Sequence, residues 1–311
     1  MIRNYLITTF RNLTKHSLYT FINIAGLSLG ISISLLIVLY VVHEFEQDRF
    51  HQQGDTVYQI IGHVNYGDSP VSVTGMSAQM GPAVLESNPE VAGFFRTFQP
   101  SRVVVSVDDR RTFYEGQFLF ADAALLQTLT FPLVSGAVST EPMTVVITER
   151  AAQKYFGNVD PVGKVITYDH EYLFQVSGVV ENPPSTSSLQ FDFIGSFTSL
   201  ASLGERERNF FSQEKVSLGG FATYLVIPSP DVAAKVAGTI PALVNASGIE
   251  NGDDTFSVNA FLDHSMQRYE ASYTFTFLGI ALAILALALI NYVNLTTARA
   301  TLRAKEVGIR K

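Results

Sequence analysis

Two long apolar segments without a charged residue place this chain in a membrane. They run from Phe21 to Val42 and from Tyr273 to Leu295. A helix needs roughly 20 apolar residues to cross a hydrocarbon core of about 30 Å, so each segment is long enough to span a bilayer. A buried core helix rarely runs this far without a charge. A cleaved signal peptide would end at small residues, whereas the first segment runs into His43 and acidic residues.

Lysine and arginine are unevenly distributed around these segments. Residues 1–20 hold three basic residues and no acid, and residues 296–311 hold five with Glu306 as the lone acid, whereas residues 43–272 hold 13 basic and 27 acidic residues. Basic residues accumulate on the cytoplasmic side of spans, so we expect both termini in the cytoplasm and residues 43–272 outside it. Near-helical apolar spacing also predicts an amphipathic helix within residues 1–20, on the inner membrane surface.

The external region begins and ends with similar patterns of strand, helix and strand. Two such β-α-β units commonly form a ferredoxin-like α/β sandwich. The acidic balance of the region excludes a nucleic-acid-binding surface. The first unit is predicted at 57–65, 76–86 and 94–98, and the second at 221–227, 231–245 and 255–261.

The segment between the two units contains several sequences typical of β-strands. One helix is well marked, because Thr148 can cap it, residues 149–156 form it and Gly157 can end it. Residues 196–220 are polar, and we expect them to be mobile. The predicted strands of this insert are 103–107, 112–120, 144–147, 165–168, 172–180 and 189–193.

Candidate chemical motifs give weak signals. The stretch GNVDPVGKV has five residues between its glycines and no hydroxyl after Lys164, so it reads as a turn rather than a phosphate-binding loop. Asp169-His170-Glu171 reads as a hairpin turn. No cysteine or Gly-x-Ser-x-Gly nucleophile occurs, and we expect no cofactor, no metal site and no catalytic site. A cluster just after the first span could suggest a metal site, although a solvated surface is the preferred interpretation; it comprises His43, Glu44, Glu46, Asp48 and His51.

Small residues in the first apolar segment favour close helix packing. Gly26, Gly30 and Ser34 are spaced four residues apart, a pattern that lets another helix approach closely. Two spans alone enclose no pathway, so we expect additional permease helices or a second copy beside them.

Five stretches are familiar in combination. They are YLITTFRNLTKHSLYTFINIAGLSLG, HEFEQDRFHQQGDTVYQI, VVITERAAQKYFGNVDPVGKVITY, FQVSGVVENPPSTSSLQFDFIGSF and NYVNLTTARATLRAKEVGIRK, and they run nearly from end to end. With them the chain resembles the FtsX/MacB-type permeases of ATP-binding-cassette systems, in particular the first half of the long bacterial members. The resemblance implies a ferredoxin-like porter part at about 55–100 and 217–262 and a β-rich, Sabre-like insert at about 102–195.

The resemblance also implies a function. A separate cytoplasmic ATPase subunit would hydrolyse ATP, and the permease would transmit the movement to its periplasmic domain, which is called mechanotransmission. Such systems handle peptides, toxins, macrolides or lipoproteins. The implied location is the bacterial inner membrane, as a multi-pass protein among membrane lipids, with a periplasmic adaptor as a further candidate partner. The family continues beyond EVGIRK, so the resemblance implies that this chain is a fragment or a truncated product.

The cytoplasmic end is the candidate coupling site. We predict that residues 299–311 and the amphipathic helix at 2–18 contact the ATPase, whereas the alternative is a simple basic anchor on the membrane surface. Two other functions stay open from the residues alone: a two-span sensor with an external ligand-binding domain, and a membrane-anchored external enzyme. The predicted ATPase contacts are Arg303, Lys305, Glu306 and Arg310.

Overall fold

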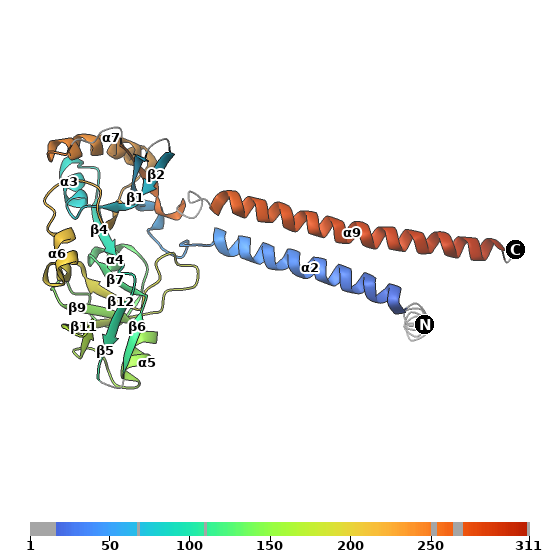
Figure 1. The fold of residues 1–311 in the computed structure, drawn as a ribbon, viewed down its shortest axis with the longest axis horizontal. Helices are drawn as coiled ribbons and strands as arrows, with labels where there is room; N and C mark the ends of the chain where they lie inside the picture. The colour runs from blue at the N-terminus through green and yellow to red at the C-terminus, as the bar shows by residue number, and fades with distance from the viewer. Residues whose placement is uncertain (1–16, 67–68, 109–110, 250–253, 264–269, 310–311) are drawn as a thin grey trace. The chain divides into compact units, whose positions relative to one another are not determined.

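The computed structural model describes residues 17–66, 69–108, 111–249, 254–263 and 270–309. These residues form two compact units: the helix pair α2 (Ser17–Phe45) and α9 (Glu270–Ile309), and a mixed α/β domain between Gln47 and His264 (Figure 1). The segments Ile24–Phe45 and Phe275–Asn294 are long and apolar enough to cross a membrane. Only 17% and 6% of their apolar windows are buried, unlike the core helices of soluble domains.

Helices α2 and α9 pack against each other in antiparallel orientation. Residues near the end of α2 contact residues near the start of α9. The ring of Tyr40 meets that of Phe277 edge to face, with centroids 5.9 Å apart, while Gly30 lies against Ala288. Helix α9 has 40 residues, so it is about 60 Å long. This is about twice the thickness of a hydrocarbon core. The predicted second span and the described part of the basic segment after it are therefore one continuous helix.

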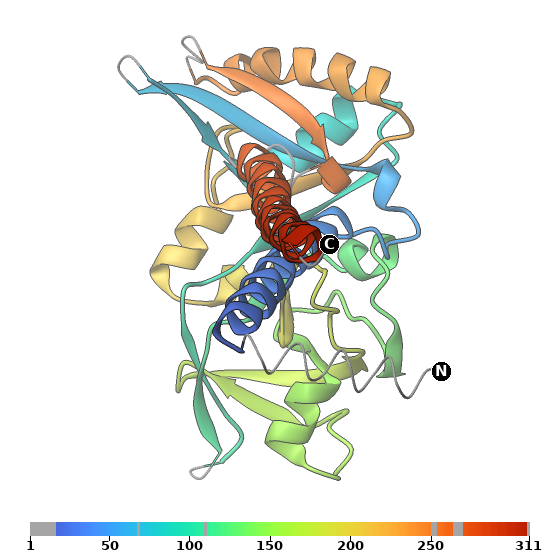
Figure 2. The same cartoon turned by 90° about the vertical axis from the view of Figure 1, so that its right-hand side faces the viewer.

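Both predicted β-α-β units are confirmed. Their four strands form an antiparallel sheet in the order β14-β1-β13-β4, and both helices cover the same face of it, which is the ferredoxin-like arrangement (Figure 2). We call this the α/β part. Its elements are β1 (Val57–Tyr66), α3 (Met80–Ser87), β4 (Gly93–Phe98), β13 (Phe221–Val226), α7 (Pro230–Ala246) and β14 (Thr255–Ala260).

Helical periodicity explains how α7 covers the sheet. Proline stands at the first helical position, where its missing N–H costs nothing. Buried residues then recur every three or four positions, at Ala233, Val236, Ile240 and Val244. They meet the alternate side chains of β1, including Ile60, in one apolar core. Short elements flank this part: η1 (Gly54–Thr56), β2 (Ser69–Val73), β3 (Gly75–Met76) and η3 (Phe261–Asp263).

The insert, residues 103–211, extends the same sheet in the order β7-β12-β9-β11-β10-β5-β6. The two parts join through a ladder between β4 and β7, where Thr97 pairs with Ala121 and Phe98 with Phe120. The insert consists of β5 (Val103–Ser106), β6 (Thr112–Glu115), β7 (Phe118–Ala121), α4 (Ala124–Thr128), β8 (Leu133–Gly136), β9 (Thr144–Thr148), α5 (Glu149–Phe156), β10 (Val165–Tyr168), β11 (Tyr172–Val180), β12 (Phe193–Ser196), η2 (Phe197–Ser202) and α6 (Glu205–Phe211).

Two strand predictions within the insert are wrong. The strand expected at 112–120 breaks at Gly116 and Gln117, and its halves pair with different partners, β5 and β12. The strand expected at 189–193 begins only at Phe193. Residues 196–220, for which no secondary structure was predicted, contain η2 and α6, and a few apolar side chains such as the buried Leu200 anchor them.

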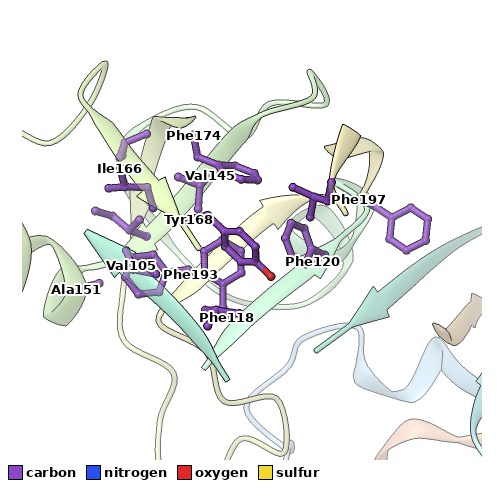
Figure 3. Packing of buried hydrophobic residues seen from close by; sticks show 14 of the residues in the cluster. Val105, Phe118, Phe120, Val145, Ala151, Ile166, Tyr168, Phe174, Phe193 and Phe197 are labelled. Atoms are coloured by element: carbon purple, nitrogen blue, oxygen red, sulfur yellow. The ribbon is translucent and has the colours of Figure 1, made fainter. Parts of the chain in front are cut away.

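An aromatic core holds the insert together. The rings of Phe118 and Phe193 stack with centroids 5.4 Å apart, and those of Tyr168 and Phe174 pack around them (Figure 3). These side chains come from four different strands, β7, β12, β10 and β11. Aromatic pairs contribute about 0.5–1.5 kcal/mol each beyond the area that they bury. The insert therefore has an aromatic core of its own, to which four strands contribute.

Candidate functional site

The three small residues of α2 lie on the side that faces α9. A Cβ added at Gly30 would lie 2.7 Å from the Cβ of Ala288, closer than two carbon atoms can stand, so glycine sets the approach of the helices there. The hydroxyl of Ser34 donates a hydrogen bond of 3.0 Å to the carbonyl of Ala281, and Ser34 is buried. At Gly26 the nearest side-chain atom of α9 is an amide nitrogen of Asn291, 3.6 Å from such a Cβ.

The predicted ATPase contacts lie at the far end of α9. Positions 303, 305 and 306 belong to its helical backbone, whereas Arg310 lies outside the described residues. Residues three apart lie on one helix face, so Arg303 and Glu306 share a face, while position 305 is turned about 100° from Glu306. The predicted amphipathic helix at 2–18 lies outside the described residues except for its last two positions, where α2 begins.

The glycine-lysine stretch is a turn between α5 and β10, as predicted. Gly157 and Gly163 have φ angles of +62° and +80°, which glycine adopts freely. The carboxylate of Asp160 accepts the N–H of Val162, and the N–H of Gly163 donates to the carbonyl of Val176. These bonds fold the stretch back on the sheet. The hairpin turn at Asp169 and His170 is confirmed too, with positive φ at both residues.

The polar cluster after the first span was expected to be a solvated surface. For Asp48 and His51 this expectation is wrong. Both are buried, at 2% and 5% exposure. Among the described residues no group of three or more His, Cys, Asp or Glu side chains is placed to hold a metal ion.

His51 sits among aromatic rings in the core that joins the two parts of the domain. Its ring is 5.1 Å from that of Phe131 in the insert and 5.8 Å from that of Phe261 at the end of the α/β part. Its Nδ1 accepts the backbone N–H of Thr130 at 3.0 Å. Desolvation lowers the pKa of His51 to about 4, so the ring is neutral at physiological pH. The proton of the neutral ring is therefore on Nε2, 3.9 Å from Asp48.

Asp48 links the same segment to a second loop of the insert. Its own N–H donates to the carbonyl of Thr186, and its Oδ1 accepts the N–H of Ser188, both at 2.8 Å. Its φ of +58° lies in the left-handed region that Asp tolerates better than most residues. Burial raises the pKa of its carboxyl, and the hydrogen bonds from Ser188 act against this. Sequence spacing could not reveal these contacts, because their partners are 79 and 140 residues away.

Comparison with known proteins identifies the class of this domain. The family described as the MacB-like periplasmic core domain matches residues 20–243, and no curated protein matches the chain. A domain from Porphyromonas gingivalis, provisionally described as a permease, has a TM-score of 0.54 at 19% identity, covering 68% of this chain and 91% of that one. This likeness shows the fold.

Two further structures match with lower scores. The periplasmic region of MacB from Actinobacillus actinomycetemcomitans has a TM-score of 0.48 at 16% identity, covering 67% of this chain and 90% of that one. The extracellular domain of the noncanonic ABC-type transporter YknZ from Gram-positive bacteria has a TM-score of 0.46 at 10% identity, covering 65% and 98%. The family match spans well over half of the chain and rests on sequence. With its two apolar helices and its mixed α/β domain, the chain belongs to the family of ATP-binding-cassette permeases that carry a MacB-like periplasmic core domain.

Proposed function

We propose that this chain is the mechanical part of a permease, which couples ATP hydrolysis by a separate cytoplasmic ATPase to a change in shape of its periplasmic domain. The family match over residues 20–243 carries the proposal. The helix pair supports it, since Gly30 and Ser34 bring the two apolar helices into close contact. The chain itself acts without catalysis. Its cargo is a peptide, a lipoprotein or an expelled small molecule, and further permease helices, a second copy or a periplasmic adaptor complete the assembly.

The proposed topology places both termini in the cytoplasm and residues 43–272 in the periplasm. The excess of basic residues at both ends supports this orientation. Alkaline phosphatase is active only outside the cytoplasm. Fusion after Asp68 should give an active enzyme, and fusion after Lys311 an inactive one. The reverse result would contradict the orientation and the function that depends on it.

The ATPase contact is proposed at the cytoplasmic end of α9. Arg303, Lys305, Glu306 and Arg310 form the contact, with residues 2–18 beside them. A lone acid among basic residues suits a docking surface of mixed charge better than a lipid anchor, which depends on total positive charge at roughly 1 kcal/mol per basic residue. Because position 305 is turned away from Glu306 on the helix, exchanging the two charges changes the surface that a partner meets.

The charge exchange tests docking against anchoring. The full-length permease carrying Lys305→Glu and Glu306→Lys together keeps its net charge. We expect loss of co-purification with the ATPase and of ATPase stimulation, while the amount of protein in the membrane stays normal. As a matched control, Lys305→Arg with Glu306→Asp keeps each sign in place and should retain both properties. Normal stimulation by the exchanged variant would leave the anchor as the explanation of the basic segment.

A further inference from the structure

The segment that follows the first span is fastened to the insert and not only to the strand that it leads into. Helix α2 ends at Phe45 and β1 begins at Val57. Between them, Asp48 is bonded to the loop at 186–188 and His51 to Thr130. The N–H of Gln52 adds a bond of 2.9 Å to the hydroxyl of Thr130. Three successive attachments thus hold residues 48–52 on two loops of the insert. We call this set of contacts the clasp.

The two key side chains of the clasp are buried. The side chains of Asp48 and His51 are 3% and 0% exposed, so water does not compete for their hydrogen bonds while the clasp is closed. A buried acceptor or donor that loses its partner without gaining water is destabilising. The rings of Phe50, Phe131 and Phe261 surround the imidazole. Opening the clasp would expose this aromatic cluster as well as the two polar groups.

The segment that leads toward the second span also contacts the clasp. Strand β14 leads into η3, whose Phe261 touches the ring of His51. A Cβ at Gly54 would lie 2.9 Å from a methyl carbon of Leu262, also in η3. The described parts of both adjoining segments therefore meet at the clasp, and among these residues the hydrogen bonds to the insert come from the first segment.

We propose that the clasp is the positioning element that delivers movement of the first span to the insert, with Asp48 and His51 as its key residues. This inference rests on the proposed function, since it assumes that the spans move. The clasp stays closed during the cycle and acts as a fixed attachment. Without it, a displacement of the first span would reach β1 alone, and the insert would follow only through the sheet.

The chain offers a matched control for Asp48. Asp169 also has positive φ, donates its N–H to a distant carbonyl, that of Val104, and accepts the N–H of the same residue at 2.7 Å. It lies in the exposed hairpin turn between β10 and β11, away from both membrane connections in the sequence. Asp169→Ala therefore removes a side-chain acceptor of the same geometry, at an exposed site, without touching the clasp.

Amide hydrogen exchange of the full chain in lipid nanodiscs tests whether the clasp exists. Protection at Ser188 and Thr130 should match that of the neighbouring strands. Asp48→Ala should speed exchange at Ser188 at least tenfold, whereas Asp48→Asn, which keeps an acceptor oxygen and tolerates positive φ, should restore protection. Fast exchange at both amides in the unaltered chain would overturn the clasp, and this measurement needs no ATPase.

Spin labels test transmission in the assembled permease. The chain has no cysteine, so cysteines at Val159 in the insert and Ala234 in α7 carry the labels uniquely. When ATP and the ATPase are added, the distance between the labels should change in the unaltered chain, in Asp48→Asn and in Asp169→Ala. In Asp48→Ala and His51→Leu this change should vanish, while the rate of ATP hydrolysis stays the same. An ATP-dependent change that persists in Asp48→Ala would overturn the inference. A chain that responds to ATP in no variant, with exchange protection intact, would instead contradict the proposed function.

Discussion

At the scale of single residues, His51 makes the stability of the domain depend on pH. Its pKa of about 4 in the folded domain lies below the value of about 6.5 in an unfolded chain. The unfolded chain therefore binds a proton between these values that the folded domain does not bind. Stability is full above pH 6.5 and falls as the pH drops toward 4. At pH 5 the loss is about 2 kcal/mol.

His51→Asn isolates this effect, because asparagine can accept the N–H of Thr130 but does not titrate. Asp48 titrates with the opposite sign: burial raises its pKa, so its contribution is full below about 3.8 and declines as the pH rises through the folded value. Both proteins keep Asp48, so its titration contributes to the pH dependence of both. We expect the unaltered chain to lose about 2 kcal/mol more than His51→Asn between pH 8 and pH 5, measured by urea unfolding followed through tyrosine fluorescence. Equal losses would show that His51 titrates normally.

Thr148 makes one hydrogen bond that the sequence predicts and one that it does not. Its role as the cap of α5 was predictable, and its hydroxyl accepts the N–H of Ala151 at 3.2 Å. Its second bond, donated to Asp192 at 3.0 Å, was not predictable, because the partner lies 44 residues away. The same limit applies to His51 and Asp48. Local hydrogen bonds follow from spacing, whereas contacts across the sheet follow from strand order, which the sequence pattern does not contain.

Replacement of Thr148 by alanine removes both bonds. Loss of a helix cap typically lowers the free energy of unfolding by about 1 kcal/mol. The N–H of Ala151 is buried and would lose its hydrogen-bond partner, which lowers it further. We expect a decrease of about 1–2 kcal/mol in the free energy of unfolding, measured in urea. Thr148→Ser keeps the hydroxyl and should cost less than half as much. If serine and alanine were equally damaging, the lost methyl group rather than the cap would explain the effect.

At the scale of elements, the close contact between α2 and α9 depends on Gly30, which has no side chain. Gly30→Leu would drive a side chain into Ala288, so the helices should separate around this point. Gly279 in α9 has no neighbouring atom within 4 Å of its would-be Cβ, which makes Gly279→Leu the matched control. Spin labels at positions 40 and 277, where two rings now meet, should report a longer and broader distance for Gly30→Leu only. An unchanged distance would mean that Gly30 does not set the packing.

Long elements were predictable, and so were short strands rich in β-branched residues such as β10, whereas two other short elements were not. Helix α7 repeats its buried positions along most of its length, and β1 is a ten-residue run rich in β-branched and aromatic residues, so both patterns stand out. Helix α4 has five residues and β8 four, too few to show a period, and neither was predicted. The break between β6 and β7 follows from their different partners rather than from the local pattern, since Gly116 and Gln117 alone do not forbid a continuous strand.

At the scale of the whole molecule, one core joins the α/β part to the insert. It combines Val57, Phe95 and Tyr224 with Leu119 and Phe131. At the same junction the guanidinium of Arg96 makes two bonds of 2.8 and 2.9 Å to the carboxylate of Asp122 and lies over the ring of Phe197. Neither part can lose its structure without exposing this shared core.

We therefore expect residues 47–264, produced without the helices, to fold as one cooperative unit. Its thermal unfolding should show a single transition, with the same midpoint by circular dichroism and by tyrosine fluorescence. Spectra that report two separate transitions would mean that the parts fold independently, and a product without a transition would mean that the spans are needed for folding.

The pairing of β1 with β14 fixes how tension would load this domain. The strands are antiparallel neighbours, and Tyr58, near the start of β1, pairs with Ala260, at the end of β14. The chain therefore arrives from one span and leaves toward the other at the same end of the ladder. Separating forces there act in the unzipping direction, which breaks hydrogen bonds one rung at a time, rather than in shear, which loads them all together. The clasp and the contact between Gly54 and Leu262 lie outside the first rung, and both must yield before the ladder can open.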